Sequence, residues 1–295
     1  MHSFLATVQD PHSVITPIES GLLFPEILPV MLEKYEMSIL EFVELIAHSS
    51  TSAELLERIR DPQIPAVRRI SLLKLFRRCV SGVLDTEMAR KIKVVSTASL
   101  VENYGSTFKL ISKLREQFAH LDERSKSVLA VAMGENDYRG RSGYELTSRF
   151  FDWFSAKFVG QLTIEGPRGA GRDIELCSVI PSFTGACPCD FVIRNQVGND
   201  VIAVGFARYD STRGGSQSDD RTGGNSAKVY MIRDFCKPPM TPLRILFVAD
   251  GPGLTHGDTW GEAVKLDGFW DDNVRVTTLK LSDERVTLSW LRSTT

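Results

Sequence analysis

The chain has 295 residues, of which 42% are hydrophobic and 24% charged, with a formal net charge of -2 at pH 7. This is the composition of a globular protein that can bury a sizeable core, in one large domain or two ordinary ones. The charge balance argues against nucleic-acid binding through overall positive charge, although a local basic cluster could still bind. No run approaches the roughly 18 apolar residues of a membrane span, and the first residues lack the features of a secretory signal. The five cysteines are few and odd in number, which fits a reducing compartment better than a disulfide framework. We therefore expect a cytoplasmic protein.

The first half of the chain, over residues 30–158, is predicted to be helical. Residues 28–49 place apolar side chains at helical spacing. Residues 51–60 open with a Ser/Thr cap and a glutamate three residues later, which is a helix-start signal. A further helix is expected over 142–159, where Trp153 and its phenylalanine neighbours should belong to the core or to a dimer interface.

Between these helices, residues 66–84 form a basic stretch that follows two prolines. It has five basic side chains and no acid. An apolar stripe is expected along this helix, so its arginines are either a solvated face or a DNA contact. The expected stripe consists of Val67, Ile70, Leu73, Phe76 and Val80.

After Gly160 the pattern changes to short β-branched runs bounded by Gly, Pro, Asn and Asp, which is typical of strands. The alternation of strands and helices predicts a mixed α/β sheet. We therefore expect a mainly helical region over 1–159, for DNA binding or dimerisation, and an α/β region over 160–295, with one compact domain as the alternative. The expected strands are 161–166, 173–180, 189–195, 201–210, 243–250 and 274–281, and the expected helices are 223–236 and 257–272.

Several common catalytic motifs are missing. The glycine-rich segment 166–171 is not followed by Lys-Ser/Thr and does not open a helix, so it is not a phosphate-binding P-loop. Cys187 and Cys189 are spaced too tightly for a usual zinc site and are interpreted as small residues at the start of a strand. No G-x-S-x-G string indicates a serine hydrolase.

One constellation does predict chemistry. Asp190 begins a strand, and a hairpin turn leads into the strand 201–210, which brings Asp190 close to Arg208 and Asp210. Hydrolysis of phosphodiesters by a divalent metal needs acids that converge on Mg²⁺ and a cation near the phosphate. Asp190 and Asp210 are the candidate metal ligands, and Arg208 is the candidate cation.

The run P-x-D-F-V-I followed by V-I-A-V-G-F-A-R resembles the hairpin of PD-(D/E)XK nucleases, and the chain resembles type II restriction endonucleases of that superfamily over about residues 160–290. The resemblance implies a restriction-endonuclease-like mixed sheet flanked by helices. It also implies Mg²⁺-dependent cleavage of double-stranded DNA at a short recognition sequence, usually by a homodimer, as part of a restriction-modification system.

The (D/E)XK element itself departs from the family pattern. Residues two apart share a strand face, but neither Gly205 with Ala207 nor Phe206 with Arg208 includes an acid. Arginine holds its proton near neutral pH and is a poor general base. The acid could instead come from Asp210 or from another segment, and Lys228 could supply the ammonium group. The acids considered from other segments are Glu175, Asp219 and Asp220.

The segment 211–225 would then be the loop that leaves the active-site strand and approaches DNA. Arg213 and Arg221 could contact phosphate or guanine, and Gln217 could contact a base edge. Asp219 and Asp220 could accept from cytosine or hold those arginines. The alternative for this segment is an ordinary solvated loop. Asp250, at the end of a later strand, is expected to be a structural turn residue.

The sequence therefore predicts a type II site-specific endodeoxyribonuclease that depends on Mg²⁺. The main alternative is a non-catalytic DNA-binding protein with a nuclease-like fold, since the acid of the strand is missing. A phosphate-ester enzyme that acts on small molecules is a third possibility.

Overall fold

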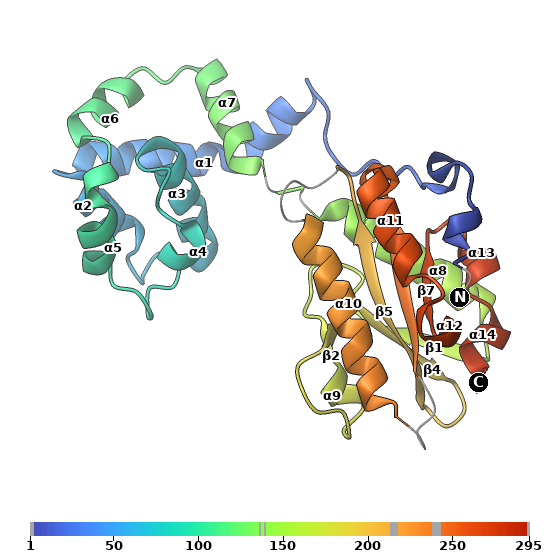
Figure 1. Cartoon of the computed structure of the whole chain (residues 1–295). Helices are drawn as coiled ribbons and strands as arrows, with labels where there is room; N and C mark the ends of the chain where they lie inside the picture. The colour runs from blue at the N-terminus through green and yellow to red at the C-terminus, as the bar shows by residue number, and fades with distance from the viewer. Residues whose placement is uncertain (1–2, 136, 139, 213–217, 238–242, 294–295) are drawn as a thin grey trace. The chain divides into compact units, whose positions relative to one another are not determined.

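The computed structural model describes residues 3–135, 137–138, 140–212, 218–237 and 243–293, and within 218–223 it describes the backbone alone. The chain forms two compact units: Met1–Ser20 together with Gly140–Thr295, and Gly21–Arg139 (Figure 1). The second unit is thus an insertion in the first. The division does not fall at the expected 159/160 boundary, because the preceding helix packs its phenylalanines on the sheet of the first unit.

The inserted unit is helical, as predicted, and is built around a core of its own. Thr51 caps a helix by accepting a hydrogen bond from the Glu54 amide at 3.0 Å, and the Glu54 carboxylate accepts one from the Ser50 amide at 2.7 Å. This confirms the helix start predicted from the Ser/Thr cap. Its helices are α1 (Ile27–His48), α2 (Ser52–Ile59), α3 (Ala66–Cys79), α4 (Thr86–Ala89), α5 (Thr97–Tyr104), a 3-10 turn (Gly105–Thr107), α6 (Ile111–Phe118) and α7 (Glu123–Gly134).

The basic helix α3 uses its charges within the unit. Ion pairs join Arg68 to Glu41, Lys74 to Asp137 and Arg78 to Glu135. Arg69 is buried and donates to two backbone carbonyls. The predicted apolar stripe was partly wrong, because Val67, in the first turn, is 80% exposed. The buried apolar face consists of Leu72, Leu73, Leu75, Phe76 and Cys79. These contacts favour a structural role for the helix.

The other unit is organised around a five-stranded mixed sheet of order β1-β4-β5-β6-β7. The pairs β1/β4 and β4/β5 are antiparallel, whereas β5/β6 and β6/β7 are parallel. This confirms a mixed α/β architecture. The strands of the sheet are β1 (Leu162–Glu165), β4 (Phe191–Asn195), β5 (Val201–Tyr209), β6 (Arg244–Asp250) and β7 (Val274–Thr277), and a separate pair is formed by β2 (Ile174–Glu175) and β3 (Pro188–Cys189).

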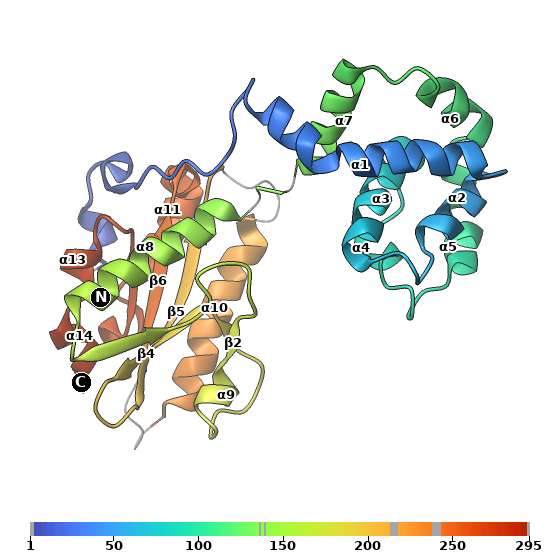
Figure 2. The ribbon, with the colours of Figure 1, turned by 180° about the vertical axis from the view of Figure 1, so that it is seen from behind.

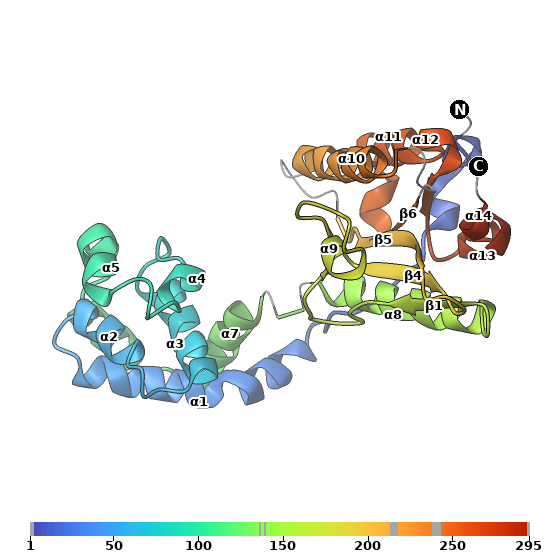
Figure 3. The same cartoon turned by 90° about the horizontal axis from the view of Figure 1, so that it is seen from below.

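Helices cover both faces of the sheet, which Figures 2 and 3 show from behind and from below. On one face α8 (Arg141–Lys157) and α14 (Leu288–Arg292) bury Phe150, Phe154 and Trp290 against one set of strand side chains. This confirms the aromatic helix as core. On the other face α10 (Ser218–Phe235) and α11 (Gly257–Leu266) pack on the alternate strand residues, among them Phe206 and Phe247.

Three details of the prediction need correction. The expected strand 173–180 is a strand only at its start, because the chain turns into the short helix α9 (Leu176–Val179). The last strand ends at Thr277, ahead of α13 (Ser282–Arg285). The expected loop 211–225 is helical from Ser218 onward. The remaining short helices are α12 (Phe269–Asp272) and 3-10 turns at Leu5–Thr7, Pro11–Val14 and Pro252–Thr255.

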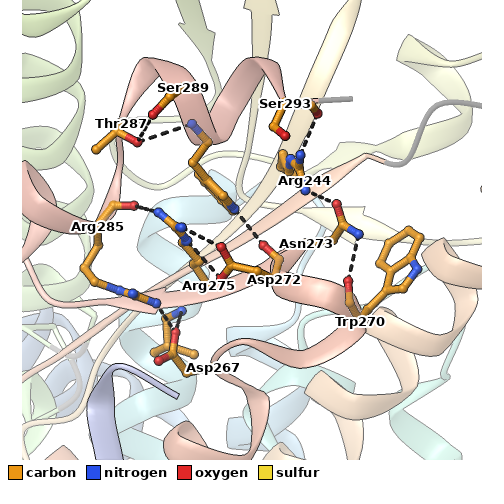
Figure 4. Close-up of polar contacts among 12 residues, drawn as sticks. Arg244, Asp267, Trp270, Asp272, Asn273, Arg275, Arg285, Thr287, Ser289 and Ser293 are labelled. Atoms are coloured by element: carbon orange, nitrogen blue, oxygen red, sulfur yellow. Dashed lines mark hydrogen bonds and ion pairs between the residues drawn. The ribbon is translucent and has the colours of Figure 1, made fainter. Parts of the chain in front are cut away.

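The outer edge of β7 is covered by a polar network drawn in Figure 4. Asp267, which is buried, accepts hydrogen bonds from the Val276 amide at 3.1 Å and from the Leu5 amide at 3.1 Å, and it forms a buried ion pair with Arg285. Arg275 pairs with Asp272 in the same network. An exposed strand edge would offer unpaired backbone groups to other chains. The network satisfies such groups from within the chain.

The first residues of the chain are tied to the strand ends. The buried carboxylate of Asp250 accepts from the Thr16, Gly251 and Leu279 amides at 2.8, 2.8 and 2.9 Å. Tyr209 accepts from the Ile18 amide at 2.9 Å and donates to the Thr16 carbonyl at 3.1 Å. These contacts support the structural role expected for Asp250. Across the described residues, no helix combines the length and the apolar character that a membrane span needs.

Candidate functional site

A cavity of about 210 Å³ lies at the carboxyl end of β5, between the sheet, α10 and α11. Its floor is apolar and includes the stacked rings of Phe206 and Phe247, whose centroids are 5.2 Å apart. Its polar lining mixes acids, an amide and cations. These side chains are Asp190, Arg208, Asp210, Asn225, Lys228 and Glu262. An apolar floor with a few convergent charged groups is the usual form of a binding or catalytic site.

Asp190 is held by the hairpin that the sequence predicts. Its amide donates to the Gly205 carbonyl at 3.0 Å, and its carboxylate accepts from the Ala207 amide at 2.8 Å. Burial raises the pKa of Asp190, and the nearby Asp173 carboxylate raises it further, against the lowering effects of the Ala207 amide and the Lys228 ammonium. A bound cation would offset the cost of keeping this carboxylate ionised.

Arg208 and Asp210 form an ion pair at the end of β5. Their side chains share a strand face because they are two residues apart. The Arg208 Nε donates to Asp210 Oδ1 at 2.6 Å. The Asp210 side chain is only 7% exposed, against 33% for Arg208. The Asp210 backbone is fixed on both sides, since its amide donates to the Asp250 carbonyl at 2.7 Å and its carbonyl accepts from the Gly253 amide at 2.6 Å.

Lys228 reaches the same cavity from α10. Its Nζ lies 4.2 Å from the centroid of the Phe206 ring, a cation–π distance. Within the described part of the chain, no carboxylate lies within ion-pair distance of this ammonium group. Its positive charge nevertheless lowers the pKa of Asp190. Lys228 is therefore placed to meet an anionic group that enters the cavity.

The structure brings Asp190, Arg208, Asp210 and Lys228 together and leaves Glu175 outside. Glu175 is exposed on β2, in register with Pro188, and does not line the cavity. Asp219, Asp220 and Arg221 are in the first turns of α10, where the backbone alone is described. Arg213 and Gln217 lie outside the described residues.

Sequence reasoning missed Asn225 and Glu262 in the cavity lining and Asp173 beside Asp190. Asn225 precedes Lys228 by three residues, so helical spacing on α10 could have indicated it. Glu262 belongs to α11, and no local pattern joins that helix to the hairpin.

The cysteines near Asp190 have no sign of a metal role. Cys187 and Cys189 are buried, and burial raises the pKa of both thiols, that of Cys189 to about 12. They remain protonated near neutral pH, as expected for small residues at the start of β3. Among the described residues, no three His, Cys, Asp or Glu side chains gather closely enough to hold a metal by themselves.

The Asp190 and Asp210 carboxylates still suit Mg²⁺ by their chemistry. Both line the cavity and offer hard oxygen donors. Mg²⁺ in phosphoryl-transfer sites commonly takes one or two carboxylates and completes its shell with water and substrate phosphate oxygens. A third protein ligand is therefore not required.

Comparison with protein-family models, with curated proteins and with solved structures finds no match for this chain.

Proposed function

We propose that the chain is a Mg²⁺-dependent endodeoxyribonuclease of the type II restriction kind, which hydrolyses double-stranded DNA at a short recognition sequence. The observation that supports this most is the convergence of Asp190, the Arg208–Asp210 pair and Lys228 in one cavity. A mixed sheet with helices on both faces supports the proposal at the level of coarse architecture.

In this proposal each polar group has a distinct task. Asp190 and Asp210 would hold Mg²⁺, which when bound would lower the pKa of an attacking water and neutralise phosphate charge. Lys228 would stabilise the negative charge that develops on the phosphate, because its ammonium faces the cavity. Arg208 would contact a neighbouring phosphate oxygen.

DNA recognition is assigned to the segment that directly follows β5. The proposed contact residues are Arg213, Gln217, Asp219, Asp220 and Arg221. A homodimer would match a palindromic recognition sequence by its two-fold symmetry. All five cysteines are unpaired, which fits the reducing cytoplasm as the proposed compartment.

The experiment is incubation of the purified full-length protein with bacteriophage genomic DNA, with Mg²⁺ or with EDTA, followed by gel electrophoresis. Discrete bands that need Mg²⁺ are expected. Asp190→Asn should lose cleavage, whereas Glu175→Gln, an exposed acid outside the cavity, should retain it. Intact DNA across several substrates and divalent metals would overturn the proposal.

A non-catalytic DNA-binding protein is the second candidate. It is favoured by the β5 positions Gly205 and Ala207, which carry no acid, and by the engagement of Asp210 with Arg208. Such a protein would shift DNA in a mobility assay equally with Mg²⁺ and with EDTA. Its affinity would not respond to Asp190→Asn.

A further inference from the structure

We propose that the Arg208–Asp210 ion pair is a latch on the metal site: Arg208 occupies the carboxylate oxygen that a divalent cation would take, and cation binding releases the guanidinium toward substrate phosphate. This inference rests on the proposed function. It adds an exchange of partners that neither the sequence pattern nor the nuclease resemblance implies.

The geometry of the pair makes the two cations compete. Arg208 Nε donates to Asp210 Oδ1 at 2.6 Å, and a terminal guanidinium nitrogen contacts the same oxygen. Both side chains line the cavity that holds Asp190. Asp190 and Asp210 would together hold the metal ion, so the cation and the guanidinium would compete for the Asp210 carboxylate.

The two partners differ in how firmly they are held. Asp210 is anchored by backbone hydrogen bonds to Asp250 and Gly253, and its side chain is 7% exposed. The Arg208 side chain is 33% exposed, and within the described residues its hydrogen bonds go to Asp210 alone. The carboxylate therefore stays in place during an exchange, and the arginine is the partner that moves.

The latch also explains why Arg208 lies beside the buried carboxylate of Asp210. A buried carboxylate without a compensating charge is strongly destabilising. Arg208 neutralises Asp210 while no metal is bound, and a divalent cation can replace that charge. The released guanidinium keeps its own charge and can pair with a phosphate, for which its fork of N–H donors is suited.

A purely structural ion pair predicts the opposite response to mutation. If Arg208 only stabilises the strand end, its removal lowers stability and leaves cation affinity unchanged. If Arg208 competes with the cation, its removal raises affinity. Cation affinity therefore separates the two roles without any reference to cleavage.

The test is Mn²⁺ binding to the full-length protein, measured by isothermal titration calorimetry and by electron paramagnetic resonance of free Mn²⁺. Arg208→Gln is expected to bind Mn²⁺ about 10-fold more tightly than wild type, which is within the usual range of coupling between two binding events. Arg208→Lys, which keeps a charge but makes fewer contacts, is expected to show a smaller gain and guards against misfolding of the first variant. Adding Asp190→Asn to Arg208→Gln should abolish the gain.

Arg194→Gln is the matched control. Arg194 pairs with Glu165 across β4 and β1, at 3.0 Å and outside the cavity, so its loss should leave Mn²⁺ affinity unchanged. If wild type binds Mn²⁺ and both Arg208 variants bind it equally or more weakly, the latch is wrong while the proposed nuclease stands. If neither wild type nor the variants bind Mn²⁺, the metal site of the proposed function and the latch are both overturned.

Discussion

The ring of Phe191 fills the space into which a side chain at Gly205 would project. The two residues are register partners on β4 and β5, and a Cβ at Gly205 would overlap two carbons of that ring. The ring also packs against Phe150 and Phe151 of α8. Position 205 therefore cannot carry the acid of a (D/E)XK element, because aromatic core side chains fill the space that its side chain would need.

Gly205→Ala is expected to destabilise the protein by about 1–3 kcal/mol, the usual cost of overpacking a core. Urea denaturation followed by tryptophan fluorescence measures the change. Gly143→Ala is the matched control, since that glycine is on α8 and nothing lies within 4 Å of its added Cβ. The control should be stabilised by about 0.5–1 kcal/mol, as is usual for glycine to alanine in a helix. Equal changes in the free energy of unfolding for the two variants would show that the Phe191 ring moves aside without cost.

Asp190→Asn is expected to raise stability at alkaline pH while it removes a proposed metal ligand. Burial raises the pKa of this carboxyl, so its ionised form is disfavoured in the folded state relative to the unfolded state. The advantage of the asparagine is complete above the folded-state pKa and shrinks as the pH falls below it, because wild type then binds a proton. Urea denaturation at pH 8 and at pH 4 compares the two proteins. A variant that is less stable than wild type at pH 8 would show that the ionised carboxylate is stabilising.

Asp137→Asn is expected to destabilise the helical unit by about 2 kcal/mol near neutral pH. Burial alone would raise the pKa of Asp137, but hydrogen bonds from Lys34, Lys74 and Tyr35 outweigh it and lower the pKa to about 2. This stabilisation is present above the ordinary carboxyl pKa of 3.8 and is lost as the pH falls toward 2. Denaturation followed by circular dichroism at pH 7 and near pH 2 should therefore show a loss only at pH 7. An equal loss of stability at both pH values would show that the effect of Asp137→Asn comes from altered packing and not from the lost charge.

Asp267→Ala is expected to cost about 3–5 kcal/mol, because it leaves the buried guanidinium of Arg285 without its partner. It also removes the acceptor for the Val276 and Leu5 amides. Thermal denaturation measures the loss. Asp283→Ala is the control, since that acid is 80% exposed and its pair with Lys157 should contribute within about 1 kcal/mol. Similar losses of stability in Asp267→Ala and Asp283→Ala would show that burial of the ion pair does not decide its contribution.

The hairpin and its charges were predictable because their signals are local. A strand, a short turn and a second strand bring Asp190 beside the end of β5, and the period of two places Arg208 and Asp210 on one face. Lys228 was also within reach of prediction, because the helix that follows that strand carries it back toward the strand end. Function at these residues stays a prediction until cleavage is measured.

The features that the sequence did not predict depend on contacts between segments that are distant along the chain. Glu262 enters the cavity only because the crossover through β6 returns α11 beside α10. The segment 173–180 has apolar residues that suit a strand or a helix equally, and the packing of buried Leu176 decides for a helical turn. The stripe on α3 was partly misplaced, because Val67 is 80% exposed and lies off the buried face of the helix. Sequence periodicity does not report where a helix meets its partners.

The insertion of the helical unit has a consequence for the order in which the chain folds. Residues 16–18 find their partners at Tyr209 and Asp250, about two hundred residues later in synthesis. Closing so long a loop is entropically unfavourable and slow. Folding of the helical unit shortens this loop, because the Lys34–Asp137 ion pair brings the two ends of the unit together. Only the short segments 20–34 and 137–142 then separate that pair from the contact between Ser20 and Ser142. We therefore expect the helical unit to form first on the ribosome, and the amino-terminal segment to dock on the strand ends only after β5 and β6 have formed.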